Sequence, residues 1–327
     1  MKKHVIGLLK FQPIFHYRIW GGDKLKTVLH KNYSEENIGE SWEISGVPGN
    51  ETEVLTGSLK GETLATLTNK FENQLVGEKC FKAFGDEFPI LIKFLDAATA
   101  LSVQVHPDDE LAKERHNSLG KNEMWYIMDA DKDANLLIGF KKQLNKEAFK
   151  NAVQNGELME VINSIQVNKG ELYYLPAGRV HAIGSGVMLA EIQQTSDVTY
   201  RVYDYDRVDK TTGEKRELHV EESVDAIDFS MVDNYGTNYP KEKNVSNTMI
   251  DTPFFKTNYI NFDAQTELKY AENQSFKIFI CTEGSAVLTI EGHQEKIMKG
   301  EIIFLPANEK SLTILPKQSV ELLEVSY

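Results

Sequence analysis

Two histidines, a glutamate and a glutamine occur where they could form a metal site. Gln104 and His106 lie two positions apart, and Glu123 and His181 come later in the chain. Alternate residues of a β-strand face the same side, so the first two side chains are expected to point together. Two imidazoles, a carboxylate and an amide oxygen suit Zn²⁺ with positions left open for a substrate, and Fe²⁺ or Mn²⁺ would also fit. The residue types predict a metal site and leave the metal open.

The segment around His181 indicates how that side chain is presented. Gly170, Pro176, Gly178 and His181 follow the arrangement G-x5-P-x-G-x2-H, which resembles the second sequence motif of the cupin superfamily. A strand, a Pro-Gly turn and a returning strand would place the histidine at the mouth of a β-barrel.

The elements that must hold these residues are mostly strands. Short alternating or apolar runs bounded by turn residues predict strands at residues 41–45, 90–95, 101–105, 172–175 and 187–192. Helical spacing is rarer, and predicts helices at residues 64–75, 146–162 and 221–227. Asn145 is in position to cap the second of these helices. The pattern favours a β framework with a few inserted helices.

An internal repeat predicts two related β-barrel units. Residues 169–177 read KGELYYLPA and residues 299–307 read KGEIIFLPA. Asn, Gly, Lys, Ser and Pro accumulate between residues 228 and 253, where a boundary is expected. We therefore divide the chain into a catalytic domain with helical insertions at residues 1–240 and a C-terminal domain at residues 241–327.

The second unit is expected to hold no metal. Ser311 stands where the repeat aligns His181, and nothing there matches Gln-x-His. The remaining candidate, His293, follows Gly292 and is interpreted as a turn residue.

Composition restricts the possible partners and the compartment. A formal net charge of -13 without a basic run argues against nucleic acid, although a few converging cations could still bind a small anion. The apolar run at residues 5–9 is too short for a signal-peptide core, and no run has membrane-spanning length. Two widely separated cysteines predict no disulfide framework. We expect a cytoplasmic protein that does not contact a membrane.

Several motifs together resemble the type I mannose-6-phosphate isomerases. They are SVQVHPDD at residues 102–109, WGG at 20–22, GESWE at 39–43 and PAGRVHA at 176–182. The resemblance implies a tandem cupin fold, an enzyme of carbohydrate metabolism that interconverts mannose-6-phosphate and fructose-6-phosphate through an enediolate, and one Zn²⁺ per chain. Matched residue by residue, the implied zinc ligands are Gln104, His106, Glu123 and His181.

The resemblance also implies catalytic residues. The family's catalytic arginine matches Arg201 in TYRVYDYD, a form typical of the shorter bacterial branch, so the roles of a later lysine in longer enzymes do not carry over. Glu191, on the strand leading to Arg201, is either the base that moves the C2 proton or the partner of a neighbouring cation. Histidine and water relays through Asp197 are other possibilities for the proton transfer. Lys93, a charge within an apolar strand, and Lys121, which matches a family lysine, are the predicted substrate-binding residues.

Three alternatives stay open at this stage. Another cupin enzyme would share the histidine and glutamate ligands but use a different metal. A non-catalytic cupin would bind a sugar without converting it. Glucose-6-phosphate, which differs from mannose-6-phosphate only in its C2 configuration, could be the preferred substrate. The sequence does not predict an oligomeric state.

Overall fold

The computed structural model describes residues 6–271 and 274–327, and strands predominate in it. The strands that build the first two sheets are β1 (Ile14–Gly22), β2 (Ile38–Ile44), β3 (Ile90–Ala97), β4 (Val103–Val105), β5 (Glu123–Ala130), β6 (Asn135–Phe140), β7 (Ile162–Gln166), β8 (Leu172–Leu175), β9 (His181–Ile183), β10 (Val187–Gln194) and β11 (Tyr200–Tyr203). Those of the third sheet are β12 (Ser246–Asp251), β13 (Lys256–Phe262), β14 (Thr266–Lys269), β15 (Lys277–Ile290), β16 (His293–Met298), β17 (Ile302–Leu305) and β18 (Ser311–Ser326). The mainly β prediction is confirmed.

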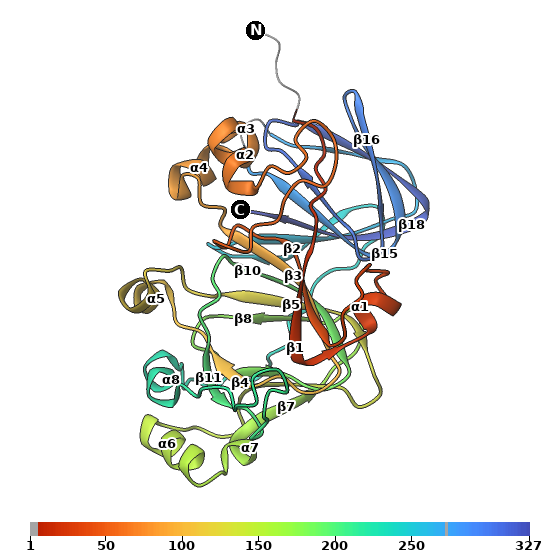
Figure 1. The fold of residues 1–327 in the computed structure, drawn as a ribbon. Helices are drawn as coiled ribbons and strands as arrows, with labels where there is room; N and C mark the ends of the chain where they lie inside the picture. Colours follow the sequence, from red (N-terminus) through yellow and green to blue (C-terminus); the bar gives the residue numbers. More distant parts are fainter. Residues whose placement is uncertain (1–5, 272–273) are drawn as a thin grey trace.

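Two sheets face each other in the first part of the chain (Figure 1). One has six strands in the order β1-β2-β3-β10-β5-β8, and the other has five in the order β11-β4-β9-β6-β7. Apolar side chains from both sheets form the core between them, for example Trp125 and Leu189 from the first sheet and Leu136 and Ile183 from the second. Because side chains alternate along a strand, the outer face of the six-stranded sheet is left for another contact.

That outer face packs against the last third of the chain. Met124 and Tyr126 of β5 belong to the same buried cluster as Ile278 and Phe304 of the third sheet. Helices also join this cluster, among them the helix that contains Leu67. The six-stranded sheet is therefore the middle layer of the molecule, buried on both faces, which explains why its strands are almost continuously apolar.

The third sheet has seven strands, with the path β12-β13-β18-β15-β16 extended by β14 on β18 and β17 on β15 (Figure 1, blue). Its own core is apolar and includes Phe262, Phe279 and Leu322. Leu9 pairs with Phe304 through two backbone hydrogen bonds of 2.9 and 2.8 Å, so the N-terminal segment also contacts this sheet. Within the described residues 6–271 and 274–327, none of the three sheets closes into a barrel, because each strand order ends at an edge strand on both sides. The prediction of two separate barrels is therefore not confirmed.

The internal repeat does correspond to matching local structure. The first copy contains β8 and is followed by β9, which begins at His181; the second contains β17 and is followed by β18, which begins at Ser311. His293 is the first residue of β16, and its Nδ1 accepts a 2.9 Å hydrogen bond from the Leu8 amide. This hydrogen bond gives His293 a structural role at the start of β16.

The helices differ in length from the prediction. They are α1 (Lys24–Thr27), α2 (Leu64–Phe71), α3 (Asn73–Val76), α4 (Glu78–Phe84), α5 (Asp109–His116), α6 (Lys146–Gln154), α7 (Leu158–Val161) and α8 (Val220–Ala226). The first predicted helix breaks at Glu72, whose φ is 48°, and the second breaks near Gly156, whose φ is 73°. Asn145 caps α6 as predicted, by accepting a 2.8 Å hydrogen bond from the Ala148 amide.

Other predictions from composition can be compared with the described residues. Cys80 and Cys281 are both buried and free. Among the helices that the structure describes, none has the length and apolar character needed to cross a bilayer. The apolar run at residues 5–9 lies partly outside the described residues.

Candidate metal centre and active site

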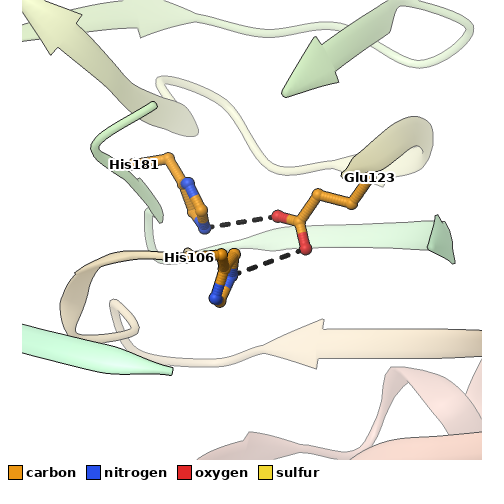
Figure 2. A group of neighbouring side chains, drawn as sticks. All are labelled: His106, Glu123 and His181. Carbon is orange, nitrogen blue, oxygen red and sulfur yellow. Dashed lines mark ion pairs between the residues drawn. The ribbon is translucent and has the colours of Figure 1, made fainter. Parts of the chain in front are cut away.

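Three side chains from three different strands or strand ends meet between the facing sheets. His106 follows β4, while Glu123 and His181 are the first residues of β5 and β9. Figure 2 shows both imidazoles directed at the Glu123 carboxylate, with Nε2 of His106 3.6 Å and Nε2 of His181 3.2 Å from its oxygens. All three residues are buried, and one potential ligand atom of each lies within 4.8 Å of the others. This arrangement can hold a metal ion.

Backbone carbonyls fix the orientation of both imidazoles. Nδ1 of His106 lies 3.0 Å from the carbonyl oxygen of Val198, and Nδ1 of His181 lies 2.8 Å from that of Arg179. With Nδ1 protonated, each ring donates to its carbonyl and turns the lone pair of Nε2 toward Glu123. Burial lowers the pKa of His181 to about 3 and that of His106 well below its usual value. Both rings are thus neutral near pH 7, the form that binds metals.

The Glu123 carboxylate lacks a full set of partners. Its Oε1 is buried and accepts no hydrogen bond, which is costly for a carboxylate unless a cation is nearby. Burial raises the pKa of Glu123 to about 7, although the positive charge of Lys121 opposes that rise. A bound divalent cation would satisfy this oxygen and favour the ionised form. The donor set therefore fits a metal ion.

The predicted fourth ligand lies beside the same site. Gln104 is on β4 opposite His181 of β9, and its amide nitrogen is 3.3 Å from Nε2 of that histidine. Turning the amide by 180° would place the oxygen, the atom that binds metals, in the same position.

The Lys121 ammonium lies next to the metal-site residues. Its Nζ is 2.5 Å from Oε2 of Glu123, 3.0 Å from Nε2 of His106 and 4.0 Å from Glu191. The residue is only 4% exposed, so these carboxylates offset the cost of burying its charge. Burial lowers the pKa of Lys121, but the two carboxylates outweigh burial and leave that pKa raised.

A row of side chains crosses the inner face of the six-stranded sheet beside this cluster. Strand register pairs Trp42 with Lys93, Lys93 with Glu191, and Glu191 with Trp125. Trp125 Nε1 donates a 2.9 Å hydrogen bond to Glu191, Lys93 Nζ is 3.5 Å from the same carboxylate, and Lys93 also lies 4.6 Å from the centre of the Trp42 ring. Burial opposes ionisation of Glu191, yet Lys121 and Lys93 hold its pKa below the usual value.

At the outer end of this row, a second carboxylate is held between cations. Glu40 accepts hydrogen bonds of 2.9 and 3.0 Å from Arg18 and one of 2.7 Å from Trp42 Nε1. Burial opposes its ionisation, but the charges of Lys93 and Arg18 hold the pKa of Glu40 far below its usual range. These contacts order the cavity wall.

All of these groups adjoin one cavity of about 460 Å³. Gln104, Lys121, Lys93 and Glu191 line it, whereas the His-Glu-His cluster lies just behind them. Arg201 of β11 lines the same cavity, and its strand register places it opposite Gln104. All eight residues that the sequence singled out are thus collected at one place.

Sequence reasoning missed several lining residues. Trp125 could have been found, because it lies two positions after Glu123 on one strand and so faces the same side. Glu40 stood in the GESWE motif without an assigned role. Arg216 and His219 carried no local signal, because the folding of the chain after β11 brings them to the cavity.

Comparison with known proteins agrees with this geometry. The model for "Phosphomannose isomerase type I, catalytic domain" matches residues 8–151, and that for "Mannose-6-phosphate isomerase, cupin domain" matches residues 245–320. The mannose-6-phosphate isomerase ManA of Bacillus subtilis is 36% identical over 301 residues, 91% of this chain and 92% of that protein. The chain belongs to the type I phosphomannose isomerases. As a member of this family, it is an isomerase.

Other relatives of this phosphomannose isomerase match most of its length. The mannose-6-phosphate isomerase of Streptococcus mutans is 34% identical over 304 residues, 93% of each chain. A crystal structure of the Bacillus subtilis mannose 6-phosphate isomerase superimposes with a TM-score of 0.88 at 32% identity, and the match covers 98% of this chain and all of that one. The fold of the whole chain is therefore the fold of its relatives.

Proposed function

We propose that this enzyme interconverts mannose-6-phosphate and fructose-6-phosphate in a metal-dependent proton transfer between C1 and C2. The observation that supports this most is the juxtaposition of a His106–Glu123–His181 cluster with the buried Glu191 at one cavity. The mannose-6-phosphate isomerases to which the chain is similar agree with the substrate.

The metal in this proposal is one Zn²⁺ per chain, bound by His106, Glu123, His181 and the side-chain oxygen of Gln104. Neutral imidazoles, a carboxylate and an amide oxygen suit zinc with a position left for substrate. A bound zinc ion would supply a Lewis acid that stabilises negative charge on the substrate oxygens at C1 and C2.

Glu191 is the proposed base. Its carboxylate takes the proton from C2 of the open-chain aldose and gives it to C1, while the hydroxyl proton of O2 passes to O1. The hydrogen bond from Trp125 and the charge of Lys93 keep this carboxylate ionised and fix its direction. Pairing of Glu191 with a neighbouring cation was the alternative to a role as base in the sequence analysis. The two roles are compatible, because the ion pair with Lys93 can orient Glu191 as a base.

The cations around Glu191 have separate proposed roles. Arg201 would place a permanent charge near the oxygens that become negative. Lys93 and Lys121 line the cavity and would contact substrate hydroxyl oxygens. Because both lysines already face carboxylates, they are better suited to orient the sugar than to bind its phosphate.

The broader proposals concern organisation and location. We assign residues 1–240 to the catalytic domain and residues 241–327 to a metal-free domain, each an elaborated cupin unit, and place the enzyme in the cytoplasm. The match of a cupin-domain model to residues 245–320 supports the second unit. The main buried cluster of this unit is apolar and includes Phe279.

The test is a coupled assay with mannose-6-phosphate that carries deuterium at C2. We expect turnover to fructose-6-phosphate with a slower rate for the deuterated substrate, and Glu191→Gln to lose turnover while it still binds zinc. Equal rates for both isotopic forms would count against C2 proton transfer as the slow step. Faster turnover of glucose-6-phosphate in the same assay would assign the other aldose as substrate.

A further inference from the structure

The chain that follows β11 supplies one end of the cavity. Residues 204–219 leave the sheet, form a small hairpin closed by the Val208–Lys215 bridge, and return to α8. Arg216 and His219 of this segment line the cavity together with Arg201. Arg201 is opposite Gln104 in the sheet, so the segment that follows β11 lines the cavity on the side of that strand.

Positive charge is concentrated at this end. Arg201 forms no ion pair in the described part of the chain; its Nε donates to Ser102 at 3.3 Å and its Nη1 to the Glu217 carbonyl at 3.0 Å. Arg201 and Arg216 line the same cavity. Burial lowers the pKa of Arg201, and the charge of Arg216 lowers it further, while the charge of Asp204 opposes both effects. Like charges in a half-buried position are costly unless an anion joins them.

The Arg216 side chain is held in place by a carboxylate. Its Nε and Nη2 donate to the two oxygens of Asp204 at 2.8 and 2.5 Å. Asp204 is 5% exposed and also accepts a hydrogen bond from Nη2 of Arg207. Nη1 of Arg207 donates a hydrogen bond to the carbonyl oxygen of Ala100. One carboxylate therefore serves two arginines, and Nη1 of Arg216 is left without a hydrogen-bond partner in the described residues.

The acidic groups at this end offset its positive charge only in part, because Asp204 is shared by Arg207 and Arg216. Asp209 lines the cavity, but its carboxylate accepts from the Thr211 amide at 2.8 Å and forms no ion pair in the structure as described. Asp197 lines the cavity as well and has no ion pair there. By contrast, the cations at the other end, which are Arg18, Lys93 and Lys121, each have a carboxylate within 3.5 Å.

We infer that Arg216, oriented by Asp204, binds the phosphate of the sugar phosphate. The inference rests on the proposed function and identifies the phosphate end of that site. A guanidinium with a fixed plane and free N–H groups suits a phosphate dianion, and such charge-assisted bonds are strong. A sugar phosphate would then extend from the metal end, where C1 and C2 react, to residues 204–219.

The experiment compares Arg216→Gln with Lys215→Gln. Both variants remove one positive charge from the same segment, but Lys215 is exposed, pairs with Asp206 and does not line the cavity. We expect Arg216→Gln to raise the KM for mannose-6-phosphate roughly 10- to 100-fold with little change in kcat. It should weaken competitive inhibition by inorganic phosphate by a similar factor. Lys215→Gln should change neither value more than about twofold.

Equal KM values for the two variants would overturn the inference, as would a lower kcat with unchanged phosphate inhibition. Arg216→Lys keeps the charge and an Asp204 contact, so we expect an intermediate KM; a KM as high as that of Arg216→Gln would contradict a role for the charge. The phosphate site can also be tested without turnover, so failure of the proposed function can be distinguished from failure of this inference. Even if mannose-6-phosphate is not converted, inorganic phosphate should raise the melting temperature of the wild-type protein more than that of Arg216→Gln.

Discussion

Replacing Glu123 by Gln tests the metal site without creating a cavity. The two side chains have the same shape, and the residue is fully buried, so the surrounding packing is retained. Lys121 would lose its ion pair with Glu123 at 2.5 Å, but the Glu191 carboxylate lies 4.0 Å away, so the buried ammonium would still have an anionic partner. We therefore expect the metal-free variant to lose only about 1–3 kcal/mol of stability.

The effect on zinc binding should be larger. Loss of the only anionic ligand in the proposed set should weaken zinc binding by roughly 100-fold or more, about 2.7 kcal/mol. Zinc at 100 times the wild-type Kd stabilises the wild type by about 2.7 kcal/mol, but such a variant by only about 0.4 kcal/mol. For 327 residues, an unfolding entropy of about 0.7 kcal/mol per degree converts these values to shifts of about 4 °C and under about 1 °C.

Differential scanning fluorimetry with and without zinc measures these shifts directly. Glu291→Gln is the matched control, because Glu291 is exposed in the turn before β16 and should keep the wild-type shift. If Glu123→Gln also keeps the full zinc-induced shift, Glu123 is not a ligand, and the proposed site is incorrect.

Three further predictions concern stability and reactivity. Gly77→Ala should cost about 1–3 kcal/mol more than Gly57→Ala in urea unfolding. Both glycines have positive φ, but only at Gly77 would an added Cβ clash with a backbone oxygen, that of Gln274. The folded-state pKa of Glu40 lies below its unfolded value near 4.5, so its ionisation stabilises the fold above that pH and the benefit is lost as pH falls. The melting-temperature gap between wild type and Glu40→Gln should accordingly narrow from pH 7 to pH 4, and a constant gap would contradict this. Burial raises the pKa of both cysteines to about 12, so a thiol reagent at pH 8 should label neither until the protein is unfolded.

The sequence predicted residues that lie close together in the structure where chemistry and strand alternation agree. The Gln-x-His pattern and the Pro-Gly turn before His181 are local features, so they indicated the correct strand ends before any contact was known. The repeat likewise predicted the strands β8 and β17, since each copy carries its own turn and stop signals.

Features that depend on pairing between distant segments were not predictable. The row formed by Lys93, Glu191 and Trp125 depends on strand register, and a slip of one residue would turn each side chain to the opposite face. The helix breaks were also missed, because Glu72 adopts a positive φ that its own propensity does not favour. Arg207 and Arg216, which follow β11, both contact Asp204 only because the hairpin brings them together, and no sequence spacing predicts that contact.

The most direct test of the central claim is a zinc titration of chelated enzyme in the mannose-6-phosphate assay. The proposal predicts that chelation abolishes turnover and that activity returns linearly with added zinc, reaching a plateau at one zinc per chain. Full activity in protein shown by elemental analysis to contain no metal would contradict the claim.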